Sequence, residues 1–314
     1  MKIAVIGSGG VGGYFGARLA ASGSSVTFVA RGRQFAALKR NGLSIQSSRG
    51  NLHLEAIRVV EDIAKVGPVD RAVIAVKLWD IEEVGKATKS LVDEGASVLS
   101  LQNGVDKDDV LRRYLPAEAV LGAVCYISAE IGDPGVIRHN GIVQQIIFGE
   151  YSGKTSQRST MFLEACRQAA IDAEISDSIE RLIWQKFVFL VGLSGTTTTM
   201  RQSIGSIREN ERTRSFLLDL MREVVDVGRT RGVALDENFA QEQIAFCDTL
   251  PASMTSSMHR DLQQGHRLEL PWLSGGVVRL GKMVGIETPL NRSVTAILEP
   301  FVRGRSTSSG ISTG

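Results

Sequence analysis

The chain has 314 residues, of which 43% are hydrophobic and 22% charged, and its formal net charge is +2. Because a single core rarely grows past about 250 to 300 residues, we expect two domains. The composition is that of a globular protein and excludes wholesale disorder or a fibrous repeat. No dense basic run carries interleaved aromatic residues, so a nucleic-acid partner is not expected.

The three cysteines, Cys125, Cys166 and Cys247, are widely separated and form no CxxC pair. This pattern argues against a disulfide framework and a structural zinc, so we predict reduced, buried thiols and no metal site. About five apolar residues precede the first glycine, too few for a signal peptide. No run approaches the roughly 18 apolar residues of a membrane span. We therefore expect a cytoplasmic protein with no membrane partner.

The chain opens with MKIAVIGSGGVGGYFG, in which a short apolar strand, Lys2–Ile6, runs into closely spaced glycines. In the spacing Gly7-x-Gly9-x-x-Gly12, the first glycine permits a tight turn, the second lets the backbone approach a pyrophosphate, and the third lets helix pack on strand. The alternative, an ordinary glycine-rich turn, gives no reason for so many glycines. The residues predicted to surround the phosphates at this helix N-terminus are Gly7, Ser8, Gly9, Gly10, Val11 and Gly12.

The second predicted strand, Ser25–Ala30, is followed by Arg31 and Arg33 and by no acidic residue. An acid at this place binds the ribose 2′-hydroxyl of NAD, whereas an arginine accommodates the 2′-phosphate of NADP. The sequence therefore favours NADP, with a solvated basic loop as the alternative.

Strand and helix patterns then alternate as in a doubly wound α/β domain. The predicted elements are a helix over Gln34–Asn41, a hairpin over Leu43–Val60, a buried strand over Asp70–Val76, a helix over Asp80–Leu91 and a strand over Ala96–Leu101.

Lys77 and Asn103 each follow one of these strands. Ligands of open α/β sheets bind outside the carboxyl ends of the strands, so both side chains are expected to face a cofactor cleft. Either could instead be a turn residue.

The next segments, Val120–Ala129, Gly135–His139 and Val143–Phe148, read as antiparallel or mixed strands, and Met161–Ala173 as a helix. We interpret the lone His139 as a structural, hydrogen-bonded residue.

From Ser178 onward the periodicity is helical. We therefore predict an α/β Rossmann-type domain over 1–178 and an all-α domain over 179–303. The small, polar segment 304–314 is expected to be a disordered tail. The predicted helices of the second domain are Ile179–Phe189, Ile207–Arg231, Asp236–Thr249, Ser253–Gln264, Trp272–Val284 and Asn291–Val302. Their apolar faces fit either a core or a homodimer interface.

One segment of the second domain, IWQKFVFLVGLS, is apolar nearly all round and has Lys186 as its only charge. This lysine either extends to water or is desolvated, which disfavours its charged form and suits a proton donor. Lys186, Leu190 and Ser194 share one helix face and would line a cleft. Further on, Glu269 is either a helix N-terminal acid or a site residue.

Taken together, these segments resemble the ketopantoate reductase (2-dehydropantoate 2-reductase) family of pantothenate biosynthesis. The resemblance rests on KIAVIGSGGVGGYFGARLA, VARGR, VIAVK, the QNG turn, IWQK, SSMHRDL and GIETPLN. It implies a Rossmann domain, a helical C-terminal domain and NADPH bound between them. The implied activity is that of an NADP-dependent oxidoreductase of CH–OH groups, which reduces 2-dehydropantoate to pantoate.

The resemblance also implies a role for individual residues. Gly7, Gly9 and Gly12 match the phosphate-binding glycines, Arg31 the 2′-phosphate arginine, and Lys77 and Asn103 the residues of the cofactor and substrate cleft. Lys186 matches the catalytic lysine, Ser257 the serine that binds the substrate carboxylate, and Glu269 the acid beside the reacting oxygen.

At the substrate end the chain departs from the family pattern. Leu190 stands where the family has an asparagine one turn after the lysine, a second asparagine falls near Ile204, and Pro271 replaces an acid. A same-fold reductase of another branched or aromatic 2-oxo acid, of the D-2-hydroxyacid dehydrogenase type, is therefore an alternative. A third reading is a non-catalytic NADPH-sensing protein.

Overall fold

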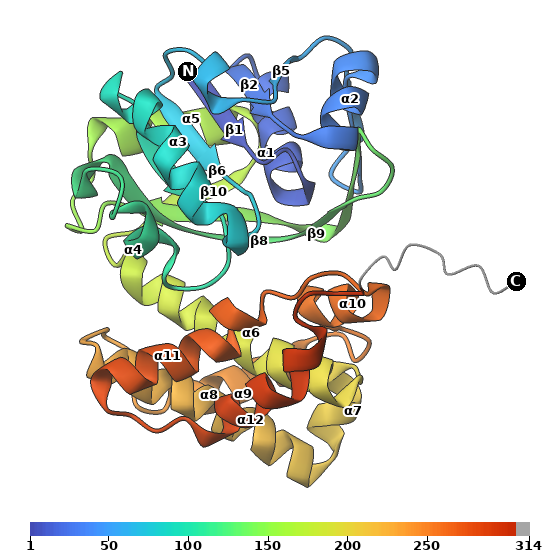
Figure 1. Ribbon diagram of the computed structural model, residues 1–314, viewed down its shortest axis with the longest axis vertical. Helices are drawn as coiled ribbons and strands as arrows, with labels where there is room; N and C mark the ends of the chain where they lie inside the picture. Colours follow the sequence, from blue (N-terminus) through green and yellow to red (C-terminus); the bar gives the residue numbers. More distant parts are fainter. Residues whose placement is uncertain (306–314) are drawn as a thin grey trace, which may run out of the picture. The chain divides into compact units, whose positions relative to one another are not determined.

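The computed structural model describes residues 1–305 and divides into two compact units, Met1–Ile183 and the chain from Trp184 onward (Figure 1). The sequence places the boundary at 178, whereas this division falls inside one continuous helix, α6 (Ile179–Met200). Of the predicted tail 304–314, residues 306–314 lie outside the described residues. The amide of Arg305 donates to the carbonyl of Gly265 (2.8 Å), so the described start of this segment is held against unit 2.

Unit 1 contains a parallel sheet with the strand order of a Rossmann domain. Across the sheet the strands run β5-β2-β1-β6-β7-β8, and every neighbouring pair is parallel. Numbered along the chain, this is the doubly wound order 3-2-1-4-5-6. The strands are β1 (Lys2–Ile6), β2 (Ser25–Val29), β5 (Arg58–Val60), β6 (Arg71–Ile74), β7 (Ser97–Ser100) and β8 (Val120–Ile131).

The third strand of that order corrects the predicted hairpin over Leu43–Val60. Strands β3 (Leu43–Ser47) and β4 (Leu52–Leu54) do form an antiparallel hairpin. Arg58–Val60 leaves it and pairs in parallel with β2 instead. Alternating apolar and polar residues predict a strand but not its partner, so the sequence pattern could not separate the two.

Beyond β8 the sheet becomes mixed, as predicted. Strand β9 (Val136–Gly149) pairs antiparallel with β8 and parallel with β3 and β10 (Asp172–Ile175). The two strands expected over Gly135–Phe148 are thus one. The predicted helix over Met161–Ala173 is wrong at its end: α5 (Gln157–Gln168) stops at a turn in which Ala170 has φ 52°, and Ala173 lies in β10.

Helices cover both faces of the parallel sheet, and β1 shows how its residues divide between them. Ile3 and Val5 pack in one core with α1 (Gly10–Ala21) and α5, whereas Ala4 and Ile6 pack in the other core with α3 (Ile81–Asp93) and α4 (Lys107–Leu111). Figure 1 shows these helices around the strands. Burial on both faces explains why such strands read as continuous apolar runs. Helix α2 (Gly32–Asn41) also belongs to this unit.

Unit 2 is helical, as predicted, with α6 in its core. Gly192 of α6 lies against Met221 of α8 (Glu211–Thr230), where an added Cβ would come 2.5 Å from the methionine Cε. The predicted helix Ile207–Arg231 is two helices, because the Asn210 side chain caps α8 by accepting the amides of Arg212 and Thr213. The helices after α6 are α7 (Ile204–Glu209), α8 (Glu211–Thr230), α9 (Phe239–Thr249), α10 (Ser257–Gln264), α11 (Ser274–Val284) and α12 (Pro289–Leu298).

Among residues 1–305, none of the helices combines the length and the apolar character that crossing a bilayer requires.

A buried carboxylate joins two of the unit 2 helices. Glu223 of α8, only 9% exposed, accepts hydrogen bonds from the amides of Leu290 (2.7 Å) and Asn291 (2.9 Å) and from Nδ2 of Asn291 (2.8 Å). These amides belong to the first turn of α12, whose N–H groups have no partners within their own helix. The negative charge also lies at the positive end of the helix dipole. Glu223 therefore caps α12 from a neighbouring helix.

We expect Glu223→Ala to lower the free energy of unfolding by about 2–4 kcal/mol, because two buried donors of Asn291 and the half-buried amide of Leu290 lose a charged acceptor. Urea denaturation measures this change. The matched control is Asp226→Asn, an exposed acid three residues further along α8, which should shift stability by less than about 0.5 kcal/mol. Equal effects of the two variants would contradict the capping role.

Candidate functional site

The register of the parallel strands gathers the predicted cofactor residues of unit 1 at one edge. Ile6 lies opposite both Val29 and Ile74, and Ile74 lies opposite Ser100. The segments that follow these residues therefore emerge together, at the carboxyl ends of β1, β2, β6 and β7. They carry Gly7, Arg31, Lys77 and Asn103. Strand order reverses between β1 and β6, which is where open α/β sheets bind their ligands.

Packing explains most glycines of the loop after β1. Gly7 has φ +96°, and an added Cβ would come 2.7 Å from the amide nitrogen of Val76, so the loop rests directly on the segment that follows β6. A Cβ at Gly10 would collide with the carbonyl of Ala129, and one at Gly12 with the carbonyl of Gly7. These positions need glycine whether or not a ligand binds.

Gly9 differs, because an added Cβ would meet no atom within 4 Å. Its backbone (φ −83°, ψ −158°) is open to other residues, and it immediately precedes α1. Within the described part of the chain, no side chain caps this helix start, and no acid lies in its first turn. Open space beside uncapped helix amides fits a pyrophosphate.

The two remaining loop residues contribute less through their side chains. Ser8 is 2% exposed, and its hydroxyl donates to the carbonyl of Val29 (3.1 Å), so its side chain is engaged inside the fold. Val11 is half-buried in the first turn of α1. A nucleotide at this loop would therefore meet Ser8 mainly through the backbone.

Arg31 is exposed at the N-terminus of α2, and its Nη2 donates to Oε1 of Glu83 (2.6 Å). Glu83 lies in the first turn of α3. Sequence reasoning considered only acids that follow β2 and so missed Glu83. The available signal was the acidic pair that begins the helix after Lys77.

Lys77 and Asn103 occupy the neighbouring strand ends. Lys77 is exposed, with its Nζ 5.6 Å from the ring centroid of Trp79. Asn103 is half-buried and precedes Gly104, which has φ +84°. The start of the Asn103 loop is held by Cys125, whose thiol donates to the carbonyl of Leu101 (3.3 Å).

The end of the Asn103 loop is anchored by a buried polar cluster. Oδ2 of Asp108 accepts from Nζ of Lys107 (2.9 Å) and from the hydroxyl of Tyr151 (2.7 Å), and the Arg112 guanidinium lies 3.7 Å from the Tyr151 ring centroid. Burial, and then the negative charge of Asp108, raise the pKa of the Tyr151 phenol above its ordinary value. The phenol therefore stays protonated and keeps donating to Asp108.

The α6 residues predicted for unit 2 share one helix face. Lys186 and Leu190 are half-buried, and Ser194 is fully buried. Beside Lys186, the rings of Trp184 and Phe187 meet edge to face at 5.8 Å. The sequence allowed Lys186 either to extend to water or to be desolvated. Its half-buried side chain lies between these two environments.

Hydrogen bonds tie the start of α10 to α6. Ser256 accepts from the amide of His259 (3.0 Å), its hydroxyl lies 3.0 Å from that of Thr197, and Nδ1 of His259 lies 2.6 Å from the Thr197 carbonyl. These contacts hold Ser257, the first residue of α10, close to α6 and one turn beyond Ser194.

Glu269 is 7% exposed and precedes a short 3₁₀ helix, η4 (Leu270–Trp272), rather than a longer α-helix. Its main-chain carbonyl accepts from the amide of Trp272 (3.0 Å). Helix α11 follows, and an added Cβ on its Gly276 would lie 4.0 Å from the ring of Phe187. Helix α11, which follows the Glu269 segment, therefore lies against Phe187, the residue after Lys186 in α6.

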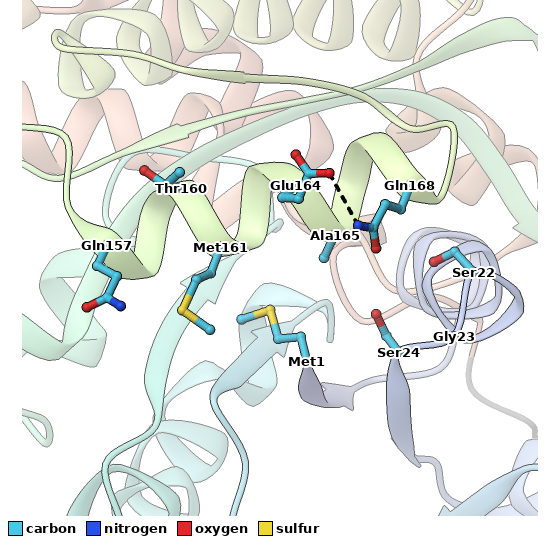
Figure 2. Close-up of a pocket in the computed structure, with 10 residues that line it drawn as sticks. All are labelled: Met1, Ser22, Gly23, Ser24, Gln157, Thr160, Met161, Glu164, Ala165 and Gln168. Carbon is cyan, nitrogen blue, oxygen red and sulfur yellow. Dashed lines mark hydrogen bonds between the residues drawn. The ribbon is translucent and has the colours of Figure 1, made fainter.

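A hollow of about 490 Å³ lies elsewhere, between α5 and the turn that connects α1 to β2. Figure 2 shows Met161 of α5 reaching toward Met1 across it. Met1 and Ser24 immediately precede β1 and β2, so the hollow lies at the amino ends of these strands. Since α/β sheets bind ligands at the opposite edge, it is not a candidate for the nucleotide site.

The residues set aside as structural behave as predicted. His139 lies with Nδ1 2.8 Å from the Ser47 hydroxyl and Nε2 2.8 Å from the Val143 carbonyl. All three cysteines are buried, and none of them forms a disulfide. Burial raises the pKa of the Cys166 thiol to about 12, which keeps it unreactive near neutral pH.

Unit 1 has a Rossmann-type edge with an open glycine loop, and the helical unit 2 carries a half-buried lysine. Together these features are those of a nicotinamide-nucleotide-dependent oxidoreductase. The sequence profile described as Ketopantoate reductase PanE/ApbA matches residues 3–153, and the profile of its C-terminal domain matches residues 178–301. The chain therefore belongs to the ketopantoate reductase family, whose members use NADPH.

Named relatives are similar over nearly their whole length. An uncharacterised oxidoreductase of Bacillus subtilis is 30% identical, with 96% of this chain and 99% of the relative covered. A 2-dehydropantoate 2-reductase of Archaeoglobus fulgidus is 31% identical, with 96% and 98% covered. The crystal structure of a PanE/ApbA family ketopantoate reductase from Ralstonia eutropha superimposes with a TM-score of 0.88 at 28% identity, covering 96% of this chain and 98% of that one.

The fold also extends to a more distant enzyme. D-mandelate dehydrogenase, solved with NADH and anilino(oxo)acetate, has a TM-score of 0.87 at 21% identity, with 96% of this chain and 98% of that one covered. At 21% identity, this likeness shows only that the two proteins share a fold.

Because Gly9 borders open space, Gly9→Ala should leave the free energy of unfolding within about 0.5 kcal/mol of wild type. It should weaken NADPH binding at least about tenfold, the cost of losing one hydrogen bond to a charged phosphate. Thermal unfolding and nucleotide fluorescence measure the two effects.

Gly7→Ala is the contrasting variant, since its Cβ would strike the Val76 backbone and its φ is positive. It should destabilise the fold itself. Unchanged NADPH binding by Gly9→Ala would contradict the assignment of this loop to the pyrophosphate.

Proposed function

We propose that the protein catalyses the NADPH-dependent reduction of a 2-oxo acid to the 2-hydroxy acid, with 2-dehydropantoate as the substrate and pantothenate biosynthesis as its role. The observation that carries this proposal is the strand register, which delivers Gly7, Arg31, Lys77 and Asn103 to the switch-point edge of a chain with both family domains. The expectations of a cytoplasmic location and of a homodimer stay predictions.

In this proposal the bound nicotinamide supplies the hydride to the C2 carbonyl. The Lys186 ammonium stabilises the developing alkoxide and donates its proton, which converts the alkoxide to the hydroxyl. Partial burial supports this role, because a charge removed from water interacts more strongly with a nearby alkoxide.

The other candidate residues hold the substrate in place. Asn103 binds near the carbonyl, Ser257 holds the carboxylate together with the first amides of α10, and Glu269 orients Lys186 and the substrate. Ser194 lies on the same face of α6 as Lys186. A carboxylate is a natural ligand for a helix N-terminus, and the ties from Ser256 to α6 support such a site at α10.

A second substrate class is supported by Leu190. This half-buried leucine lies one turn from Lys186, where the family pattern has an asparagine that helps hold the substrate hydroxyl. An apolar side chain there favours a branched or aromatic 2-oxo acid that lacks this hydroxyl. Steady-state NADPH oxidation with 2-dehydropantoate and a panel of simpler 2-oxo acids decides between the two classes.

Lys186→Ala should lower kcat at least about a hundredfold, the usual contribution of a general acid. NADPH binding should stay within about twofold, since the proposal gives the lysine no role in holding the nucleotide. Lys282→Ala, which removes an exposed lysine of α11, is the matched control and should leave both quantities unchanged. Retained turnover by Lys186→Ala would contradict the assignment of Lys186 as the general acid.

Leu190→Asn should raise kcat/KM for 2-dehydropantoate relative to 2-oxo acids without the hydroxyl by about two- to tenfold, the value of one neutral hydrogen bond. Kinetics on both substrates measure the ratio. An unchanged ratio would show that Leu190 does not contact the distal end of the substrate.

A further inference from the structure

An ion pair crosses the nucleotide edge of unit 1. Nη2 of Arg31 lies 2.6 Å from Oε1 of Glu83, and their side chains are 62% and 64% exposed. The arginine is thus accessible to a ligand, but it already holds a carboxylate. A ligand phosphate that uses this guanidinium must compete with Glu83.

The carboxylate lies beside Arg31, the residue that follows the second strand of the Rossmann order. In Rossmann domains the residue after the second strand distinguishes a ribose 2′-hydroxyl from a 2′-phosphate, an acid selecting the hydroxyl and an arginine the phosphate. Here Arg31 follows β2, and Glu83 comes from the helix after β6. The two strands flank β1, whose glycine loop occupies the same edge. The fold therefore supplies the acid that the sequence after β2 lacks.

We propose that Glu83 is a specificity-determining residue that lowers the preference of this protein for NADPH over NADH. Its carboxylate accepts a hydrogen bond from the ribose 2′-hydroxyl of NADH. Toward NADPH it acts in the opposite sense, because it occupies Arg31 and repels the 2′-phosphate. This inference rests on the proposed function, since it concerns the nucleotide of the same site.

The simpler explanation of Glu83 is that acids are favoured in the first turn of any helix. The same turn of α3 contains Glu82, which has the same charge and the same relation to the helix dipole. Oε2 of Glu82 lies 3.5 Å from the hydroxyl of Tyr114. A comparison of the two acids therefore separates the contact with Arg31 from helix and net-charge effects.

The test measures dissociation constants for NADPH and NADH with the full chain, by nicotinamide fluorescence, for wild type, Glu83→Gln and Glu82→Gln. Exposed ion pairs shift equilibria by up to about fivefold. Glu83→Gln should therefore tighten NADPH binding by about two- to fivefold and weaken NADH binding, while Glu82→Gln changes the ratio of the two constants by less than about twofold.

An Arg31→Ala background sharpens the test. Once the arginine is absent, the Glu83→Gln change should tighten NADPH binding less than it does in wild type, because there is no guanidinium left to release. The midpoint of thermal unfolding should be the same for all these variants, since the side chains of Arg31 and Glu83 are both exposed.

Weaker NADPH binding by Glu83→Gln would overturn the proposal, because Glu83 would then only orient Arg31. Equal shifts from Glu83→Gln and Glu82→Gln would also overturn it, in favour of a net-charge effect. Binding of neither nucleotide by wild type would contradict the proposed function as well, whereas a wild type that binds both with a ratio unaffected by Glu83→Gln would contradict this proposal alone.

Discussion

The nucleotide edge of unit 1 depends on the close contact between the turn after β1 and the segment after β6. Gly7 approaches Val76 so closely that a single methyl group would not fit. The contact is possible because β1 lies between β2 and β6 in parallel register. It sets the entry direction of α1, and through it the place of the open backbone at Gly9. Whatever binds at this edge meets a surface whose shape comes from backbone packing.

This dependence explains what could be predicted from the sequence. A strand, a glycine turn and a helix start are local features, so the loop and its open position could be identified without any knowledge of the sheet. Arg31, Lys77 and Asn103 could be assigned to the same edge because each follows an apolar strand, and parallel strands end together. The α/β and helical parts could be separated by the change from a period of two to a period of 3.6.

Features that require a partner could not be predicted in this way. Strand β5 (Arg58–Val60) pairs with β2, and strand β10 (Asp172–Ile175) pairs with β9. The sequence pattern of these segments does not indicate which strand each one pairs with. Glu83 approaches Arg31 across 52 positions of the sequence. Likewise, Glu223 caps a helix that begins 66 residues later, whose own N-cap residue, Thr288, makes no side-chain capping hydrogen bond. In each case the missing information is a long-range contact.

The end of the described chain has a practical consequence for work with this protein. The amide of Arg305 bonds to Gly265, and the amide of Leu268 bonds to the carbonyl of Val302 (2.9 Å). Glu269 is the next residue, so the C-terminal segment and the predicted active-site acid share one hydrogen-bonded support. Trimming the chain before residue 302, or fusing a tag there, would loosen the backbone on which Glu269 sits. Expression tags belong at a place that leaves this support intact.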